Sequence, residues 1–154
     1  MSDYNKNKNN WIAPEQENEY RKYESEFSDS KITLYISMTT ERVYQTINMV
    51  ENNDLKAKIL EFMSIFELNL KDYIKNNNYS GDPLPLNLEI ESDSVDIYWK
   101  SEYSGIYFTI YMDKISWFYT AVSDQESMSR AGTIHDLNTS ANIIKERISE
   151  MLRC

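Results

Sequence analysis

The chain has 154 residues, a formal net charge of −9 and one cysteine, Cys154. This length suits one domain with an ordinary hydrophobic core. The negative charge argues against direct nucleic-acid binding and against an anionic membrane surface, and it favours either solubility or a basic partner. A single cysteine excludes an intramolecular disulfide, which fits a reducing compartment.

Nothing in the sequence indicates export or membrane insertion. There is no run of 18 apolar residues, and the first ten residues contain no apolar stretch of the kind that a secretory signal needs. We therefore expect a cytoplasmic protein. The abundance of Asn, Lys, Ile and Tyr is typical of AT-rich coding, which suggests a bacterial or phage origin.

The first part of the chain is polar. We expect residues 1–18 to form a flexible N-terminal tail and residues 19–154 to form a single α+β domain. Aromatic residues at a spacing of three to four predict a short helix over residues 19–30. Residues 32–38 alternate between apolar and polar side chains, which predicts a strand.

Two helices are expected next. Thr39 and Thr40 offer an N-cap for a helix that carries Val43, Ile47 and Val50 at helical spacing. Asp54 offers a cap for the longest helix. Its apolar stripe consists of Leu55, Ile59, Phe62, Met63, Phe66, Leu70, Tyr73 and Ile74, and the stripe ends at the Asn-rich segment 76–83.

The second half reads as a strand meander. Residues 84–90, 95–100, 106–112 and 115–122 alternate and are rich in aromatic and β-branched side chains. Residues 123–132 read as a loop, and residues 133–135 could add a short edge strand. A terminal helix follows, with Ile144, Ile148, Met151 and Leu152 on one face. We therefore expect an α+β fold, in which an antiparallel meander of four to five strands carries one long helix and a C-terminal helix on one face.

Loop parity predicts the pairing of these strands, because apolar residues share a face only if each loop is even. The first hairpin should pair Leu88 with Ile97, and the last should turn at Asp113–Lys114 and pair Met112 with Ile115. The middle hairpin allows a four-residue loop, 101–104, or a two-residue loop, 103–104. The core face should carry Ile97, Trp99, Phe108, Ile110 and Trp117.

The same parity assigns the other face of the sheet. It should carry Tyr98, Tyr107 and Tyr111, with Glu89 directly opposite Asp96. Opposed like charges destabilise a strand pair by up to about 1 kcal/mol, so this pair favours open water or a cationic partner. Acidic charge is concentrated here, since residues 82–103 hold six acids and one base. Residues 11–38 could instead fold across this face and bury its tyrosines.

Catalytic chemistry has little support. His135 is the single histidine, Cys154 is the last residue, and no phosphate-binding loop, dinucleotide fingerprint or nucleophile elbow is present. Cys/His metal sites are excluded by count. We therefore expect no catalytic residues, no resident cofactor and no dedicated metal site, although carboxylates of the meander could hold a divalent cation.

Part of the chain resembles a known class of proteins. The long helix is followed by Pro83-Leu84-Pro85-Leu86, then by Asp93-Ser94-Val95-Asp96-Ile97-Tyr98-Trp99, then by the hairpin over residues 106–119. This order resembles a widespread class of small uncharacterised bacterial proteins, over about residues 40–152. The resemblance implies a helix, a three- or four-stranded meander and a C-terminal helix, and it implies no activity.

These observations support two main hypotheses about function. The first is a small acidic, non-enzymatic protein-binding module, such as an immunity protein, antitoxin or anti-defence inhibitor that acts on a basic partner. Its binding residues would be Glu89, Asp96, Tyr98, Tyr107 and Tyr111. The alternative is an enzyme, or a protein that binds a small ligand or divalent cation, using carboxylates of the meander. A third hypothesis is a structural subunit or homodimer that pairs through the tyrosine face.

Overall fold

The structure, a computed structural model, describes residues 14–123, 126–138 and 141–153, with side chains from residue 29 onward. The chain divides into two compact units, Met1–Leu34 and Tyr35–Cys154. Residues 1–13 of the predicted tail lie outside the described part, and the predicted domain boundaries stay predictions. No helix among the described residues combines the length and apolar character that crossing a membrane requires.

The first helix corrects two predictions. Helix α2 runs from Pro14 to Thr46, so the strand predicted over residues 32–38 is wrong, and so is the N-cap predicted at Thr39–Thr40. The alternation of apolar residues gave a wrong prediction because the buried residues of this segment recur every four positions. Met38 belongs to the apolar series but is 49% exposed. The Thr40 hydroxyl donates to the Ile36 carbonyl within the helix at 2.9 Å instead of capping a new one. The buried stripe consists of Tyr35, Thr39, Val43 and, in the short 3₁₀ helix η1 (Ile47–Met49), Ile47.

The long helix α3 spans Asn53–Asn77 and agrees with the predicted stripe. Its N-cap is Asn52, not Asp54: the Asn52 side chain accepts hydrogen bonds from the backbone N–H groups of Asp54 and Leu55. Asn78 ends the helix in the left-handed conformation at φ 52°. The buried side chains of α3 are Leu55, Ile59, Phe62, Met63, Phe66, Leu70 and Ile74.

Five antiparallel strands form a meander in the order β1-β2-β3-β4-β5, which confirms the predicted α+β fold class. The strands are β1 (Leu86–Ile90), β2 (Val95–Lys100), β3 (Ser104–Ile110), β4 (Ile115–Val122) and β5 (Ser127–Ile134). The predicted pairing of Leu88 with Ile97 is confirmed, and the middle hairpin uses the longer of its two allowed loops.

Two details of the sheet differ from prediction. Ile110 pairs with Ile115, so the β3–β4 register is shifted by two residues from the predicted pairing of Met112 with Ile115. The Tyr111 N–H donates to the Lys114 carbonyl and closes the hairpin. The two turn residues are therefore Met112 and Asp113 instead of the predicted Asp113 and Lys114. Strand β5 is eight residues long and occupies most of the segment that was predicted as a loop. The shift of two leaves every side chain on its predicted face.

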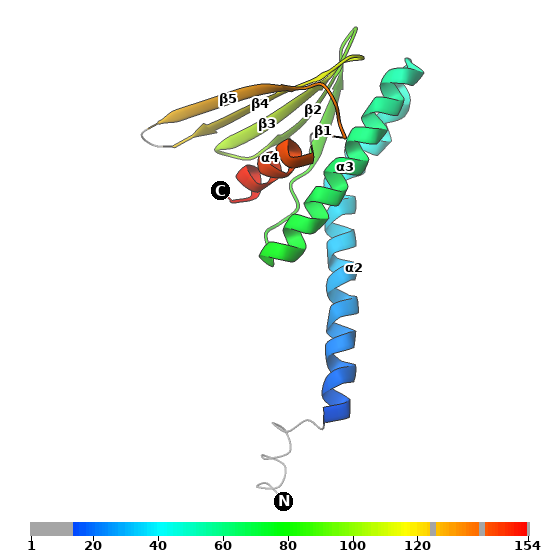
Figure 1. Cartoon of the computed structure of the whole chain (residues 1–154), viewed down its shortest axis with the longest axis vertical. Coiled ribbons are helices and arrows are strands. Elements are labelled where there is room, and N and C mark those ends of the chain that lie inside the picture. The colour runs from blue at the N-terminus through cyan, green and yellow to red at the C-terminus, as the bar shows by residue number, and fades with distance from the viewer. Residues whose placement is uncertain (1–13, 124–125, 139–140, 154) are drawn as a thin grey trace, which may run out of the picture. The chain divides into compact units, whose positions relative to one another are not determined.

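Helix α3 and the terminal helix α4 (Ala141–Arg153) lie on one face of the sheet (Figure 1), and both contact β3 and each other. Aromatic contacts join the layers: Phe62 lies 4.9 Å from Phe108, and Phe66 meets Trp99 edge-on at 5.6 Å between ring centroids. The Trp99 indole also donates to the Leu84 carbonyl, so its one polar atom is satisfied inside the core.

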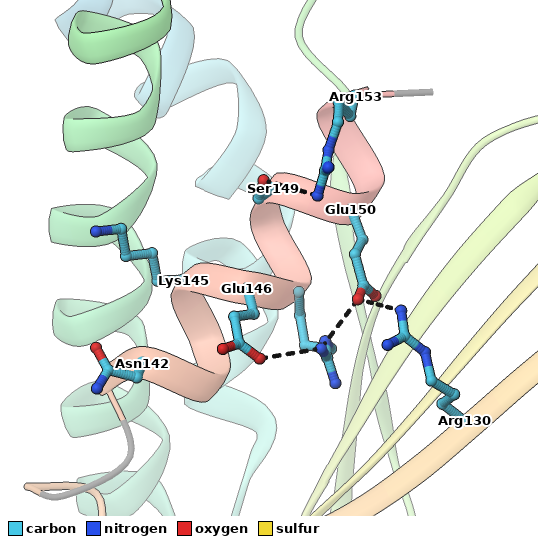
Figure 2. Close-up of a pocket in the computed structure, with 8 residues that line it drawn as sticks. Arg130, Asn142, Lys145, Glu146, Ser149, Glu150 and Arg153 are labelled. Atoms are coloured by element: carbon cyan, nitrogen blue, oxygen red, sulfur yellow. Dashed lines mark hydrogen bonds and ion pairs between the residues drawn. The ribbon is translucent and has the colours of Figure 1, made fainter.

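A charged cluster attaches helix α4 to the β4–β5 part of the sheet. Arg147, 5% exposed, lies over the Trp117 ring at 4.2 Å and donates to Glu150 at 3.0 Å. Arg130 on β5 also pairs with Glu150, beside a cavity of about 500 Å³ (Figure 2). A buried guanidinium over an indole is a cation–π contact of up to about 2 kcal/mol. The half-buried Trp117 is therefore covered by a charged residue whose charge is paired with Glu150.

Candidate functional site

The sheet face opposite the helices carries a row of side chains that crosses all five strands. The register places Tyr98 between Asn87 and Tyr107, and Phe118 between Tyr107 and Ala131. Phe118 is 44% exposed, and both tyrosines are half-buried. We call this surface the open face and define it by Glu89, Asp96, Tyr98, Tyr107 and Phe118.

Tyr98 and Tyr107 form a stacked pair at its centre. Their ring centroids are 5.5 Å apart with an interplanar angle of 20°, a geometry worth about 0.5–1.5 kcal/mol beyond area burial. The Tyr98 hydroxyl donates to Glu89 at 3.1 Å. Desolvation and then this contact with Glu89 raise the pKa of Tyr98. The two rings therefore form a preorganised platform with an acid at its border.

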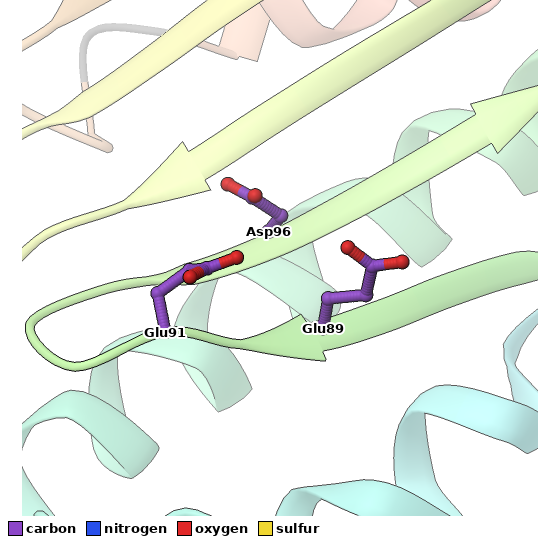
Figure 3. Close-up of side chains that lie close together, drawn as sticks. All are labelled: Glu89, Glu91 and Asp96. Carbon is purple, nitrogen blue, oxygen red and sulfur yellow. The ribbon is translucent and has the colours of Figure 1, made fainter.

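Three carboxylates gather at the β1–β2 end of the open face. Glu89 lies directly opposite Asp96, as predicted, and the turn residue Glu91 joins them (Figure 3). One oxygen from each lies within 4.8 Å of the others. The Thr109 hydroxyl donates to Asp96 at 2.7 Å, and Tyr98 donates to Glu89, so each opposed acid accepts one hydroxyl. These two bonds offset part of the repulsion between the acids.

Tyr111, the fifth predicted binding residue, lies in the turn beyond the end of β3. The Lys114 ammonium sits 5.3 Å from its ring centroid, so the tyrosine already has a cationic neighbour. The structure thus brings Glu89, Asp96, Tyr98 and Tyr107 together on the open face and places Tyr111 at the hairpin end. Their role in binding stays a prediction.

A shallow groove of about 450 Å³ runs over the β3–β5 part of the open face. Three aromatic side chains, including Tyr107 and Phe118, line the groove together with the hydroxyl groups of one serine and two threonines, an alanine and a glycine. The lining residues are Tyr107, Thr109, Ser116, Trp117, Phe118, Ala131, Gly132 and Thr133. An aromatic ledge beside hydroxyl groups suits contact with another protein, because aromatic side chains give large contact area at low entropic cost.

The structure adds two residues that sequence reasoning missed. Arg42 on α2 donates to Asn87 on β1 at 2.9 Å and brings a positive charge to the acidic edge. Glu91 completes the carboxylate cluster. The sequence could not predict the direction of its side chain, because Glu91 lies in a turn and not in a strand. Only the fold brings Arg42 to β1, since 45 residues separate the two bonded side chains.

The predicted covering of this face by residues 11–38 stays a prediction. Residues 11–13 lie outside the described part, and residues 14–34 belong to the first unit. The remaining residues, 35–38, are part of α2, whose buried Tyr35 contacts Tyr79 and donates to the Asp82 carbonyl at 3.3 Å. Tyr35 therefore packs on the loop that precedes β1, away from the stacked tyrosine pair.

His135 lines a different cavity, of about 340 Å³, between the start of α3 and the segment after β5. Its neighbours there include Asp54, Lys58 and Glu61, and none of its lining residues is Ser, Thr or Cys. Cys154 lies outside the described residues. The described part of this cavity therefore holds no hydroxyl or thiol nucleophile that the histidine could activate.

Comparison with known proteins adds no assignment: no family model, no curated protein and no solved structure matches the chain.

Proposed function

We propose that the protein is a small acidic, non-enzymatic binding module whose open face captures a protein with a basic surface. The observation that carries this proposal is the accessible stacked pair Tyr98–Tyr107, bordered by three clustered carboxylates. An immunity protein, an antitoxin and an anti-defence inhibitor are roles of this type. Each would need an anionic surface that competes for the basic site of its target.

The chemistry of the open face suits such a partner. The acids would steer a basic surface towards the sheet and pair with its Lys or Arg side chains, while the aromatic pair would supply apolar contact and cation–π stacking for a guanidinium. The hydroxyl groups of Tyr98 and Thr109, which donate to Glu89 and Asp96, hold both carboxylates in place before binding. Preorganised groups lose less entropy when the complex forms.

The test compares two variants with the same change in net charge. Glu89→Gln with Asp96→Asn removes two charges from the open face and keeps both hydrogen-bond acceptors. Glu61→Gln with Asp72→Asn, the control, removes two exposed charges from α3. A partner captured from the source cells is purified, and its affinity for each variant is measured at low and high salt.

We expect the open-face variant to lose at least about tenfold in affinity and to show a weaker salt dependence, because paired charges at an interface contribute more than 1 kcal/mol. The control should bind like the parent. Equal affinities for the open-face variant, the control and the parent would refute the proposal.

The carboxylate cluster supports a second candidate function, binding of a divalent cation. Oxygens on opposite sides of a Ca²⁺ ion are about 5 Å apart, because each lies at about 2.4 Å from the metal. The spacing of Glu89, Glu91 and Asp96 within 4.8 Å fits that geometry. Calorimetric titration with Ca²⁺ and Mg²⁺, with Glu91→Gln as the variant, separates the two functions. Saturable heat that Glu91→Gln abolishes supports the cation site, and absence of heat removes it.

A further inference from the structure

Among the described residues of the unit Tyr35–Cys154, no strand pairs with the outer edge of β5. Strand β5 is last in the sheet order, and its whole length of eight residues pairs with β4 on one side. Six of its eight residues, 127–131 and 133, are exposed. Residues 127–134 contain no proline and no acid, and Arg130 is the single charged residue. Long edges without such protection are templates for the addition of another strand.

The opposite edge of the same sheet is protected. Strand β1 has five residues, it follows Pro83 and Pro85, and Glu89 places a charge on it. Arg42 from α2 also bonds to its Asn87. Short length, proline and charge are the usual means by which proteins block edge pairing. The contrast shows that protection is concentrated on β1 and is lacking on β5.

The backbone groups that β5 presents outward follow from the hairpin that precedes it. The Ser123 N–H donates to the Glu126 carbonyl, so that pair is hydrogen-bonded and bonding to β4 then alternates along the strand. Met128, Arg130 and Gly132 direct their backbone N–H and C=O groups towards β4. The residues that direct theirs outward are Ser127, Ser129, Ala131 and Thr133.

We propose that β5 pairs with β5 of a second copy of this chain, antiparallel about a twofold axis at Ala131, to form a continuous ten-stranded sheet. In this register Ala131 faces Ala131 of the second copy, and Ser129 faces Thr133. Three hydrogen-bonded residue pairs then supply about six backbone hydrogen bonds between the copies. This inference goes beyond the proposed function and does not rest on it.

The register follows from the side chains of β5. An axis at Arg130 would place two arginines directly opposite each other, which is unfavourable. An axis at Gly132 would shorten the overlap. The axis at Ala131 keeps nearly the whole strand paired and places Arg130 opposite Gly132, so that no two charged side chains face each other across the pair.

For two copies of this acidic chain, the charge distribution favours pairing through β5 over pairing through β1. Residues 82–103, which form the β1–β2 side of the sheet, carry six acids and one base, whereas β5 carries only Arg130. Pairing through β5 therefore keeps the two acidic regions at the outer ends of the joined sheet. Two chains of net charge −9 would repel strongly at any interface built on β1 and β2.

The first experiment measures the mass of the whole chain by light scattering over a range of concentrations. We expect a dimer of twice the monomer mass of 18.2 kDa. Ala131→Pro removes one outward N–H and leaves the bonds to β4 intact, so it should give a monomer with unchanged circular dichroism. The matched control, Ala131→Ser, keeps the N–H and should remain dimeric.

A second experiment tests the register and does not depend on the folding of the proline variant. In a Cys154→Ser background, Ala131→Cys should form an intermolecular disulfide on mild oxidation, because the α-carbons of a hydrogen-bonded pair are about 5.5 Å apart. Arg130→Cys should form little disulfide, because residue 130 faces residue 132 of the second copy and not its own equivalent. A parent chain that is monomeric at all concentrations overturns the proposal, and so does equal crosslinking of the two cysteine variants.

Discussion

Replacing Gly132 with alanine tests how tightly β5 is packed under α4. A β-carbon on Gly132 would lie 2.5 Å from ring atoms of the Trp117 indole, well inside van der Waals contact. The Trp117 ring has little room to retreat, because the buried Arg147 guanidinium lies 4.2 Å from its centroid. No glycine of the described residues has a positive φ, so the requirement for glycine here is space rather than backbone conformation.

The expected magnitude follows from two opposing effects. Overpacking of a filled site costs about 1–3 kcal/mol. Replacing glycine by alanine in a strand returns about 0.5–1 kcal/mol through the lower entropy of the unfolded chain. We therefore expect Gly132→Ala to lower the free energy of unfolding by about 0.5–2 kcal/mol, and to lower the Tm by about 2–6 °C for a chain of this size.

Urea unfolding followed by circular dichroism measures this loss. The matched control is Gly105→Ala on β3, where the new β-carbon would be 3.3 Å from Tyr107 Cε2, and we expect a smaller loss of stability there than at Gly132. Combining Gly132→Ala with Trp117→Leu should add no destabilisation to that of Trp117→Leu alone, since the obstructing ring is gone. A Gly132→Ala protein as stable as the parent would refute the packing argument.

Three further predictions concern the helices. Asn52→Ala removes the side-chain acceptor of the α3 N-cap and should lower the free energy of unfolding by about 0.5–2 kcal/mol in urea titrations. Thr39→Val should raise it by about 1 kcal/mol, because the buried Thr39 hydroxyl has no hydrogen-bond partner among the described residues; a loss of stability would contradict this. Burial and then Glu67 raise the pKa of Tyr44 from 10.0 to about 12, so the stability from its neutral hydroxyl is complete below pH 10 and lost as pH rises through 12. Tyr44→Phe should flatten the fall in stability over that range, and an unchanged pH profile would show that Tyr44 is not the titrating group.

The candidate site was partly visible in the sequence. Alternation placed Tyr98 and Tyr107 on one face, and loop parity placed Glu89 opposite Asp96, as the structure confirms. The Thr109 donor to Asp96 could not be assigned, because the sequence allows two loop lengths in the middle hairpin and so two β2–β3 registers. Glu91 lies in a turn, where side-chain direction follows from backbone torsions rather than from the period of a strand.

What the sequence by itself determined is the set of elements with a strong period. The stripe of α3 and the alternation of β1 to β4 are local patterns with burial on one side, so they predict both the element and its face. Shifting one strand by two residues keeps every side chain on the same face, so alternation cannot distinguish the two β3–β4 registers. The turn in the folded chain decides between them.

Only the tertiary structure decided the nature of residues 32–38 and of β5. In α2, burial of Tyr35 and Thr39 against the rest of the unit overrides a strand-like alternation. Strand β5 has almost no apolar alternation, and it forms because β4 offers a complete ladder of backbone partners. Both depend on contacts between distant residues, which no local pattern of side chains records.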